Sequence, residues 1–215
     1  MGATGRDASS SRAKRLFDRG VATVGLVVSS PLLGAVALAV RLEDGPGVLF
    51  QQERLGFAGR TIRVAKFRSM RHNDADPTTM GRVDGTNPLV TRTGRITRRL
   101  KIDELPQLLS VARGDLSLVG PRPTLVEQLA DYDDFQRRRL EVRPGLTGWA
   151  QVNGNTSLSW DERIRLDVWY VDNWTFWLDI KILLRTIGAV LLGERRNTQA
   201  LEEATRHEAV ARGRS

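Results

Sequence analysis

The stretch GVATVGLVVSSPLLGAVALAV, residues 20–40, contains no charged side chain and decides which kind of fold the chain can adopt. A straight helix of this length would extend about 31 Å, close to the ~30 Å hydrocarbon core of a lipid bilayer. The stretch is long for the apolar part of a signal peptide, and no cleavage site followed by a secreted domain is evident. We therefore interpret it as a membrane segment, while a buried core helix remains an alternative.

The centre of this stretch reads Ser29-Ser30-Pro31, and the proline should bend or break the helix. Irregular backbone inside a membrane needs polar partners, which the two serine hydroxyls can supply. Basic residues flank both ends of the stretch: Arg12, Lys14, Arg15 and Arg19 before it, and Arg41, Arg54, Arg60, Arg63, Lys66, Arg68 and Arg71 after it. Because a single crossing usually shows a charge asymmetry, this pattern favours a re-entrant helix over residues 13–42. A proline-kinked spanning helix remains an alternative.

The overall charge points to anionic partners. Lysine and arginine number 33 against 25 aspartate and glutamate residues, which gives a formal net charge of +8. Nucleic acid fits poorly as a partner, because the aromatic side chains lie apart from most basic ones. The chain has no cysteine, and its two histidines are His72 and His207. This excludes thiol nucleophiles and disulfides and argues against a histidine triad or a zinc cluster.

The remaining chain predicts a small α+β domain that is mostly helical. Two short strands should be joined near Gly59, and a Gly-rich loop should cover residues 143–155. The other predicted elements are a polar tail at 1–12, strands within 48–56 and 61–70, a loop at 72–94, a helix from Ile96 to about Arg113, a short extended piece at 114–123, and a charged amphipathic helix at 124–140.

The C-terminal third combines aromatic and apolar residues. All five tryptophans lie between residues 149 and 177, which fits either an interfacial aromatic belt or an ordinary aromatic core. Residues 178–192 are mostly apolar, with Lys181 and Arg185 on one helical face, and are too short to span a membrane comfortably. We expect a helix that lies in the membrane interface. The stretch 194–215 is polar, and we expect it to be poorly ordered.

The stretch KIDELPQLL, residues 101–109, places two carboxylates side by side. Asp103 can act as a helix N-cap, with Pro106 in the first turn. The basic residues around the pair also suggest phosphoryl chemistry, in which the acids attack phosphorus or bind Mg²⁺ and the bases hold anionic oxygens. Arg122 is the most distinctive base, because Pro121 and Pro123 fix its backbone.

Several motifs together resemble one family. The chain is similar to the bacterial sugar transferases, also described as polyprenyl-phosphate sugar-1-phosphate transferases or monotopic phosphoglycosyl transferases. The matching motifs are KRLFDR, the Ser30-Pro31 break, GPGVLFQQERLG, KFRSM, DELPQLL, GDLSLVGPRP, PGLTGWAQVNG and LDVWYVDNWTFWLDIKILLRT. They occur in family order over residues 13–192, so we expect a short form that carries the catalytic unit alone.

The resemblance implies a specific reaction. Such enzymes transfer a sugar 1-phosphate from a UDP-sugar to a polyprenyl (undecaprenyl) phosphate and release UMP. By similarity, Asp103 is the nucleophile that forms a phosphosugar-aspartyl intermediate. Asp103 and Glu104 would hold Mg²⁺, and the substrate phosphates would contact Arg122, Arg98, Lys66 and Arg68. The product would start a membrane-linked glycan such as an exopolysaccharide, a capsule, an O-antigen or a glycoprotein glycan.

The resemblance also implies an arrangement at the membrane. Residues 13–42 would form a re-entrant helix broken at Ser30 and Pro31, and residues 43–193 a small catalytic domain with interfacial helices. This domain would lie on the cytoplasmic face of the bacterial inner membrane, and a homo-oligomer is compatible with it.

Two positions depart from the family pattern as we interpret it. Asn155 stands where many relatives should have arginine, and Ser110 stands where asparagine is frequent. Two other functions remain as alternatives: a membrane-surface scaffold without activity, and a phosphohydrolase acting on lipid phosphate. The sequence does not identify the sugar.

Overall fold

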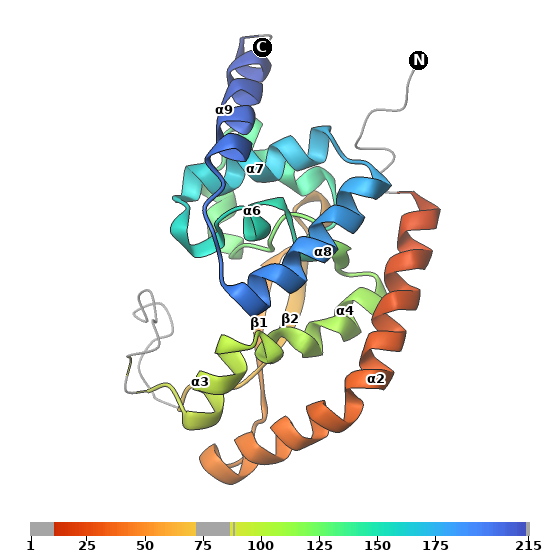
Figure 1. Cartoon of the computed structure of the whole chain (residues 1–215), viewed down its shortest axis with the longest axis vertical. Coiled ribbons are helices and arrows are strands. Elements are labelled where there is room, and N and C mark those ends of the chain that lie inside the picture. The colour runs from red at the N-terminus through yellow and green to blue at the C-terminus, as the bar shows by residue number, and fades with distance from the viewer. Residues whose placement is uncertain (1–10, 72–86, 88, 214–215) are drawn as a thin grey trace.

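The computed structural model describes residues 11–71, 87 and 89–213 (Figure 1). The chain is mostly helical with a few short strands, which confirms the predicted fold class at that level. The α-helices are α2 (Arg12–Asp44), α3 (Arg92–Arg99), α4 (Leu108–Arg113), α5 (Asp134–Arg137), α6 (Trp149–Val152), α7 (Trp160–Asp172), α8 (Phe176–Leu192) and α9 (Thr198–Arg212). Short 3₁₀ helices are η1 (Phe57–Gly59), η3 (Ile102–Gln107), η4 (Val126–Asp131), η5 (Arg138–Glu141) and η6 (Asn155–Ser157).

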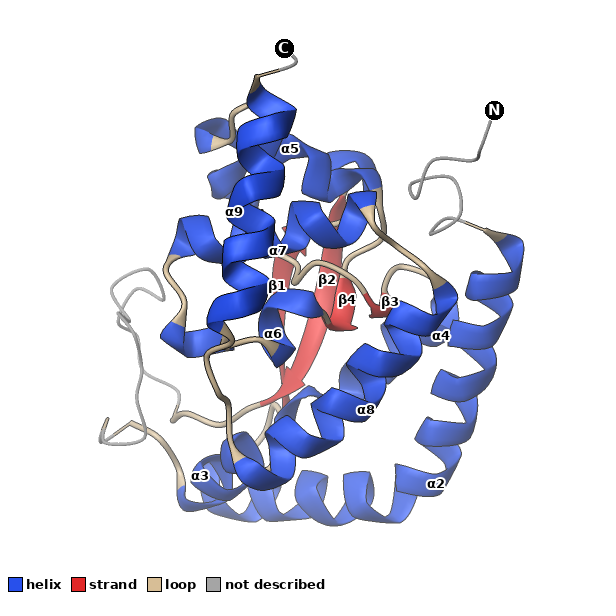
Figure 2. Ribbon diagram, turned by 45° about the horizontal axis from the view of Figure 1, so that its top comes forward, coloured by secondary structure: helices blue, strands red, loops and turns tan. Residues whose placement is uncertain are grey.

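Helix α2 contains Pro31 and bends sharply partway along its length (Figures 1 and 2). Since proline has no N–H, the carbonyl oxygen of Val27, four residues earlier, loses its usual helical donor. The Ser30 hydroxyl donates to this oxygen at 2.8 Å, and the Ser29 hydroxyl donates to the Gly25 carbonyl oxygen at 2.6 Å. The two serines therefore satisfy backbone groups around the bend, as the sequence predicted.

The outer surface of α2 is apolar. Among the described residues, α2 is the one helix long and apolar enough to cross a membrane, and only 11% of its most apolar window is buried. That low burial argues against the alternative of a core helix. Exposed apolar side chains also lie along α8, which is helical as predicted. A re-entrant course through a bilayer remains a prediction.

The part of the chain after α2 contains two small two-stranded sheets. Strands β1 (Leu49–Leu55) and β2 (Thr61–Phe67) form an antiparallel hairpin, as the sequence predicted. Its connection uses positive φ angles at Ala58 and Gly59. Strands β3 (Ser117–Val119) and β4 (Gly145–Thr147) pair in parallel. Strand β4 lies inside the predicted Gly-rich loop. Its three residues are too few to show the alternation of apolar and polar side chains that predicts a strand.

The two helices predicted from Ile96 to about Arg113 and over 124–140 do not have the predicted bounds. The first begins at Arg92 and stops at Arg99, because Lys101 adopts a left-handed conformation (φ 57°) before η3 and α4 follow. The predicted helix at 124–140 is divided into η4, α5 and η5. Tyr132 is extended there, and Asp133 starts a new helix by accepting a hydrogen bond from the Gln136 N–H.

Three segments were predicted to lack regular structure. Most of the predicted loop at 72–94, and residues 1–10 of the predicted N-terminal tail, lie outside the described residues. The prediction of a poorly ordered C-terminal stretch was wrong, because residues 198–212 form α9. Asn197 caps this helix, and Arg212 pairs with Asp133 at 2.7 Å and with Glu208 at 2.8 Å. Helix α9 packs on α7.

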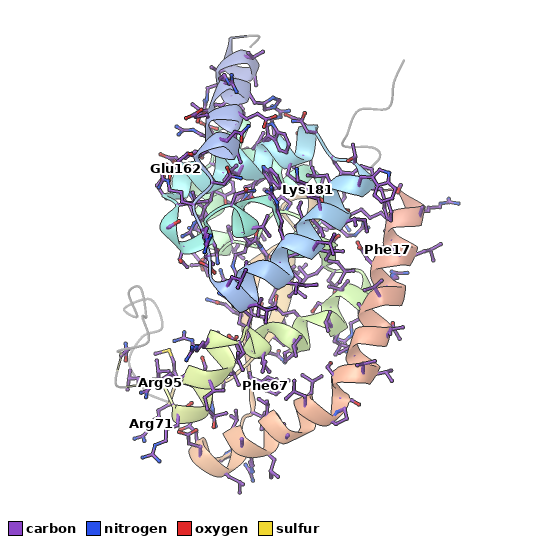
Figure 3. The ribbon with its side chains drawn as sticks, viewed as in Figure 1. Phe17, Phe67, Arg71, Arg95, Glu162 and Lys181 are labelled. Carbon is purple, nitrogen blue, oxygen red and sulfur yellow. The ribbon has the colours of Figure 1, made fainter. Side chains whose placement is uncertain are left out.

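The tryptophans were expected to form either an aromatic core or an interfacial aromatic belt, and they differ in burial. Trp149 is buried in the main core and stacks on Trp169 at 5.3 Å between ring centroids. Lys181, labelled in Figure 3, and Arg185 both lie over the Trp149 ring, so this basic pair of α8 faces the domain. Trp177 is instead 77% exposed at the start of α8.

A buried polar cluster attaches the start of α2 to α8. The Lys14 ammonium forms an ion pair with the Asp179 carboxylate, and both side chains are almost fully buried. Asp179 also accepts hydrogen bonds from the Tyr170 hydroxyl at 2.7 Å and from the Trp174 indole at 3.0 Å. Nearby, Phe17 (Figure 3) meets Phe176 edge-on at 5.4 Å. These contacts fix where α2 leaves the domain.

We predict that Asp179→Ala lowers the free energy of unfolding by ~3–5 kcal/mol, because buried Lys14 keeps only its longer 3.7 Å ion pair with Asp18 and the Tyr170 hydroxyl loses its carboxylate acceptor. Denaturant unfolding in detergent micelles measures the change. The matched control is Glu53→Ala, which removes an ion pair whose side chains are 75% and 60% exposed; its cost should stay within about 0.5 kcal/mol. Equal losses for the two variants would contradict the anchoring role.

Candidate active site

The two adjacent carboxylates lie in η3, between the two small sheets. Lys101 occupies the N-cap position of η3, so the predicted capping role of Asp103 was wrong. Asp103 and Glu104 instead lie in the first turn, and Pro106 follows inside the same short helix. The left-handed Lys101 turns the chain so that η3 packs against β2. This places Glu104 within reach of Lys66 of β2 and of Arg122, which lies in the turn after β3.

Glu104 is held by two cations. Lys66 of β2 donates to Oε1 of Glu104 at 2.6 Å, and Arg122 donates to the same oxygen at 2.5 Å and to Oε2 at 3.4 Å. Burial favours the neutral acid, but the charges of Arg122 and Lys66 outweigh it and hold the pKa of Glu104 well below its usual range. Glu104 is therefore a fixed negative charge whose Oε1 is engaged by both cations, while Oε2 has only the 3.4 Å contact with Arg122.

Asp103 is the opposite case. Its side chain is buried, with 8% of the residue exposed, and it makes no hydrogen bond or ion pair within the described part of the chain. Burial and the neighbouring charge of Glu104 raise the pKa of Asp103, against the attraction of Lys66, Arg98 and Lys101. Neither Asp103 oxygen is among the enclosed side-chain atoms without a partner in the described residues, so the carboxylate of this mostly buried residue stays open to a ligand. A perturbed pKa at such a position points to a functional role.

The other predicted bases occupy different positions. Arg98 contacts the Met70 sulfur at 3.9 Å, and its charge acts on Asp103 without an ion pair. Arg68 points away from the acids. Its guanidinium binds the carbonyl oxygens of Asp44, Gly45 and Pro46 and pairs with the Asp44 carboxylate at 2.9 Å. The structure therefore gives Arg68 a role at the end of α2 and does not bring it to the site.

Arg122 is held in place from behind. Pro121 and Pro123 restrict its backbone, and its carbonyl oxygen accepts a hydrogen bond from Arg139 at 3.0 Å. Arg139 is itself almost fully buried and paired with Asp167. The side chain of Arg122 remains 40% exposed, with Glu104 as its carboxylate partner. A substrate phosphate can therefore reach this guanidinium.

Two cavities adjoin the Arg122 side chain. A polar cavity of about 330 Å³ is lined by charged and hydrogen-bonding groups that include Arg54, Gln128 and Arg163, with Trp160 on one side. A second cavity of about 270 Å³ reaches Glu104 and Lys101 at one end and is otherwise mostly apolar. Arg122, Gln151 and Asn155 line both cavities, so the two spaces share a wall beside the acids.

Gln151 has an unusual environment in that shared wall. The residue is about nine-tenths buried, yet neither atom of its side-chain amide has a hydrogen-bond partner among the described residues. A buried amide normally finds partners, and leaving it unsatisfied costs ~1–3 kcal/mol. Because the amide can both donate and accept, a bound hydroxyl group would satisfy it well. Gln151 is therefore a candidate ligand-binding residue.

Sequence reasoning did not identify Gln151, Arg54 or Glu194. A neutral amide and an acid in a polar C-terminal stretch carry no distinctive pattern, and Arg54 was counted only as a flanking charge. Glu194 accepts hydrogen bonds from Lys101 at 3.1 Å and from Asn155 at 2.5 Å. The Asn155 departure thus lies at the site itself, whereas Ser110 is buried in α4.

The acids suit a magnesium ion that arrives with substrate. Proteins usually bind Mg²⁺ through one or two carboxylates together with substrate phosphates. Asp103 has unengaged oxygens, and Oε2 of Glu104 has only its 3.4 Å contact with Arg122. The described residues contain no group of three or more histidine, aspartate or glutamate side chains arranged to hold a metal. Asp103 and Glu104 therefore fit a metal shared with phosphates.

Comparison with known proteins gives a consistent result. A family model described as bacterial sugar transferase matches residues 9–193. The chain is 48% identical over 181 residues to the uncharacterized sugar transferase EpsL of Bacillus subtilis, covering 84% of this chain and 88% of that protein.

Longer relatives have more specific names. The chain is 44% identical over 189 residues to an undecaprenyl-phosphate glucose phosphotransferase of Komagataeibacter xylinus, covering 81% of this chain and 35% of the relative. It is 40% identical over 182 residues to the UDP-glucose:undecaprenyl-phosphate glucose-1-phosphate transferase of Escherichia coli, covering 81% and 39%. The chain thus spans less than half the length of these two relatives.

We predict opposite effects of Gln151→Leu on stability and on ligand binding. The free energy of unfolding of the ligand-free protein should rise, by up to ~3 kcal/mol, because the substitution removes a buried amide without partners. Affinity for the matching sugar nucleotide should fall about tenfold, as expected for one lost hydrogen bond. Thermal unfolding with and without a panel of UDP-sugars measures both.

The matched control for Gln151→Leu is Gln199→Leu at an exposed position of α9, which should change neither quantity. If Gln151→Leu lowered stability and left affinity unchanged, the amide would have a purely structural role.

Proposed function

The chain belongs to the bacterial sugar transferase family and is a phosphoglycosyl transferase, and from this premise we propose that it transfers a sugar 1-phosphate from a UDP-sugar to a polyprenyl phosphate. The observation that carries the proposal is the contrast between the two adjacent acids. Glu104 is engaged by Lys66 and Arg122, whereas the buried Asp103 is unpartnered among the described residues. One acid is thereby available as a nucleophile beside cations suited to phosphate.

In the first step, an Asp103 carboxylate oxygen attacks the phosphorus next to the sugar. The bond from that phosphorus to the oxygen bridging the two phosphates breaks, and UMP leaves with the bridging oxygen. The product is a phosphosugar-aspartyl intermediate. Attack on an anionic diphosphate needs its charge to be neutralised, and Lys66 and Arg122 can do this from one side.

In the second step, a phosphate oxygen of the polyprenyl phosphate attacks the same phosphorus. The bond to Asp103 breaks, and the carboxylate is regenerated as the polyprenyl diphosphate sugar leaves. Mg²⁺, held by Asp103 and Glu104 with substrate phosphates, would supply further charge stabilisation. Glu104 keeps Lys66 and Arg122 in place through both steps, so its role is to position the cations.

The polar cavity of about 330 Å³ beside Arg122 has groups that can bind the UDP-sugar donor. Arg54 and Arg122 offer positive charge for a diphosphate, and Trp160 offers an aromatic surface. Several relatives have names that include undecaprenyl phosphate, and the Escherichia coli name also includes UDP-glucose. We propose the same classes of donor and acceptor for this chain, and we leave the sugar open.

The acceptor is a lipid, which gives the apolar surfaces a purpose. We propose that α2 enters the cytoplasmic leaflet, bends at Ser30-Pro31 and returns, and that the catalytic domain lies on the cytoplasmic face. The bend and the serine hydrogen bonds are compatible with this course, and the cysteine labelling described below separates it from a proline-kinked spanning helix. The exposed apolar side chains of α8 would then contact the same leaflet.

Two rival functions make different demands on the site. A scaffold would not need an unpartnered buried carboxylate beside Lys66 and Arg122. A lipid phosphate phosphohydrolase would release inorganic phosphate without any sugar nucleotide. An experiment in which the donor is supplied without lipid separates both rivals from the transferase.

We predict that enzyme mixed with its UDP-sugar and Mg²⁺, without lipid, releases up to one equivalent of UMP and then stops. Intact-protein mass spectrometry should show the added mass of a sugar phosphate, on a peptide containing Asp103. Polyprenyl phosphate should discharge the adduct and restart UMP release. Asp103→Asn should abolish the adduct with little loss of fold, because the amide is a poor nucleophile of similar size.

Arg122→Ala provides a graded comparison for the same assay. It should slow the first step about a hundredfold or more, the typical loss for one fixed donor to developing charge. UMP release that appears only when lipid is present, without any adduct, would instead favour direct transfer.

We predict that both flanks of α2 are cytoplasmic. Single cysteines introduced at Ser9 and at Thr61 should both be protected from a membrane-impermeant thiol reagent in intact cells, and both should react after permeabilisation. The chain has no native cysteine, so the background is low. Reaction of the Ser9 position alone in intact cells would show that α2 crosses the bilayer.

A further inference from the structure

The apolar cavity beside Glu104 is not used by the donor chemistry described above. Its walls come from η3, from the β3–β4 sheet and from α8, and six of the apolar side chains are Leu105, Leu118, Leu146, Val152, Leu183 and Val190. Two threonines also line it, but the Thr147 and Thr186 hydroxyls are 2.7 Å apart, and Thr186 also donates to the Ile182 carbonyl oxygen. Because these side chains are apolar and both threonine hydroxyls are already hydrogen-bonded, this part of the wall favours the hydrocarbon part of a ligand.

One end of this cavity is charged. Lys101, Glu104, Arg122 and Glu194 line it, with the amides of Gln151 and Asn155. Glu194 is already engaged by Lys101 and Asn155, whereas the Arg122 guanidinium remains partly exposed, and Glu104 is adjacent in sequence to Asp103. A ligand that fits has an anionic head at this end and an apolar tail along the rest of the space. A nucleoside or a sugar would leave most of its hydrogen-bonding groups without partners against such walls.

The cavity also borders exposed apolar surface. Leu100 lines the cavity and is 48% exposed at the end of α3. On α8, the lining residues Ala189 and Val190 are followed by Leu191 and Leu192, which are 76% and 78% exposed. Figures 1 and 2 both show the end of α8 close to the end of α3. A hydrocarbon chain can thus pass from this surface into the cavity.

We propose that this cavity binds the phosphate-proximal isoprene units of the polyprenyl phosphate acceptor, an inference that rests on the proposed function. Its volume of about 270 Å³ lies just below the ~300–1,000 Å³ of ordinary small-molecule pockets, so it holds only a short length of a long chain. The rest of the chain stays in the bilayer beside α8. Arg122 then meets the donor from the polar cavity and the acceptor phosphate from the apolar one.

The test fills the cavity and follows the two half-reactions separately. Enzyme carrying Ala189→Phe is loaded with UDP-sugar and Mg²⁺ and then mixed with geranyl phosphate, a two-isoprene acceptor, in detergent. We expect the UMP burst of the first step to match wild type and the discharge of the adduct to slow about tenfold or more, the scale of a steric misfit in an apolar pocket. Val190→Phe, at the neighbouring lining position, should behave alike.

Leu184→Phe is the matched control, because it places the same ring on α8 at a position that is 66% exposed and does not line the cavity; its burst and discharge should both match wild type. Discharge at the wild-type rate in a folded Ala189→Phe enzyme would overturn the inference. Loss of the burst in that variant would also overturn it, by assigning the cavity to the donor.

A separate binding measurement keeps this inference distinct from the proposed function. Calorimetric titration of the resting enzyme with geranyl phosphate does not depend on a covalent step. We expect binding to wild type and to Leu184→Phe, and about tenfold weaker binding to Ala189→Phe. Equal affinities would overturn the cavity assignment, whereas wild-type binding without any UMP burst would count against the aspartyl mechanism alone.

Discussion

The rest of the site depends on the pair of charges that surround the Glu104 carboxylate. Lys66 reaches it from β2 and Arg122 from the turn after β3, so one carboxylate connects η3 to both small sheets. Since these ion pairs are partly buried, removing one partner would leave an uncompensated charge. The same contacts engage Oε1 of Glu104 and leave Asp103 as the acid without a partner. Two neighbouring residues of similar chemistry thereby acquire different roles.

The proposed attachment to the membrane depends on a second constraint, the bend in α2. Pro31 removes a backbone donor in the middle of an apolar helix, and the Ser30 hydroxyl satisfies the carbonyl oxygen that this leaves open. The buried pair of Lys14 and Asp179 fixes the start of α2 against α8. The bent helix and the exposed face of α8 are therefore held in one body with the acids. This arrangement suits an enzyme whose acceptor never leaves the bilayer.

The sequence predicted the family better than the local geometry. The Asp-Glu pair, Arg122 and the proline break were recognisable because several rare features coincide at fixed spacing. Arg68 was misplaced because a basic residue in a strand looks the same whether it binds phosphate or backbone carbonyls. The helix breaks at Lys101 and Asp133 depend on tertiary packing that outweighs helical patterning. The role of Gln151 depends on its burial, which single-sequence patterns do not show.

The central claim is that Asp103 takes the phosphosugar before the lipid arrives, and isotope exchange tests it most directly. Wild-type enzyme is incubated with its UDP-sugar, Mg²⁺ and radiolabelled UMP in the absence of polyprenyl phosphate. Because the first step is reversible on this account, label should enter the UDP-sugar, and Asp103→Asn should show none. Absence of exchange in wild-type enzyme that still transfers sugar phosphate to polyprenyl phosphate would contradict the account.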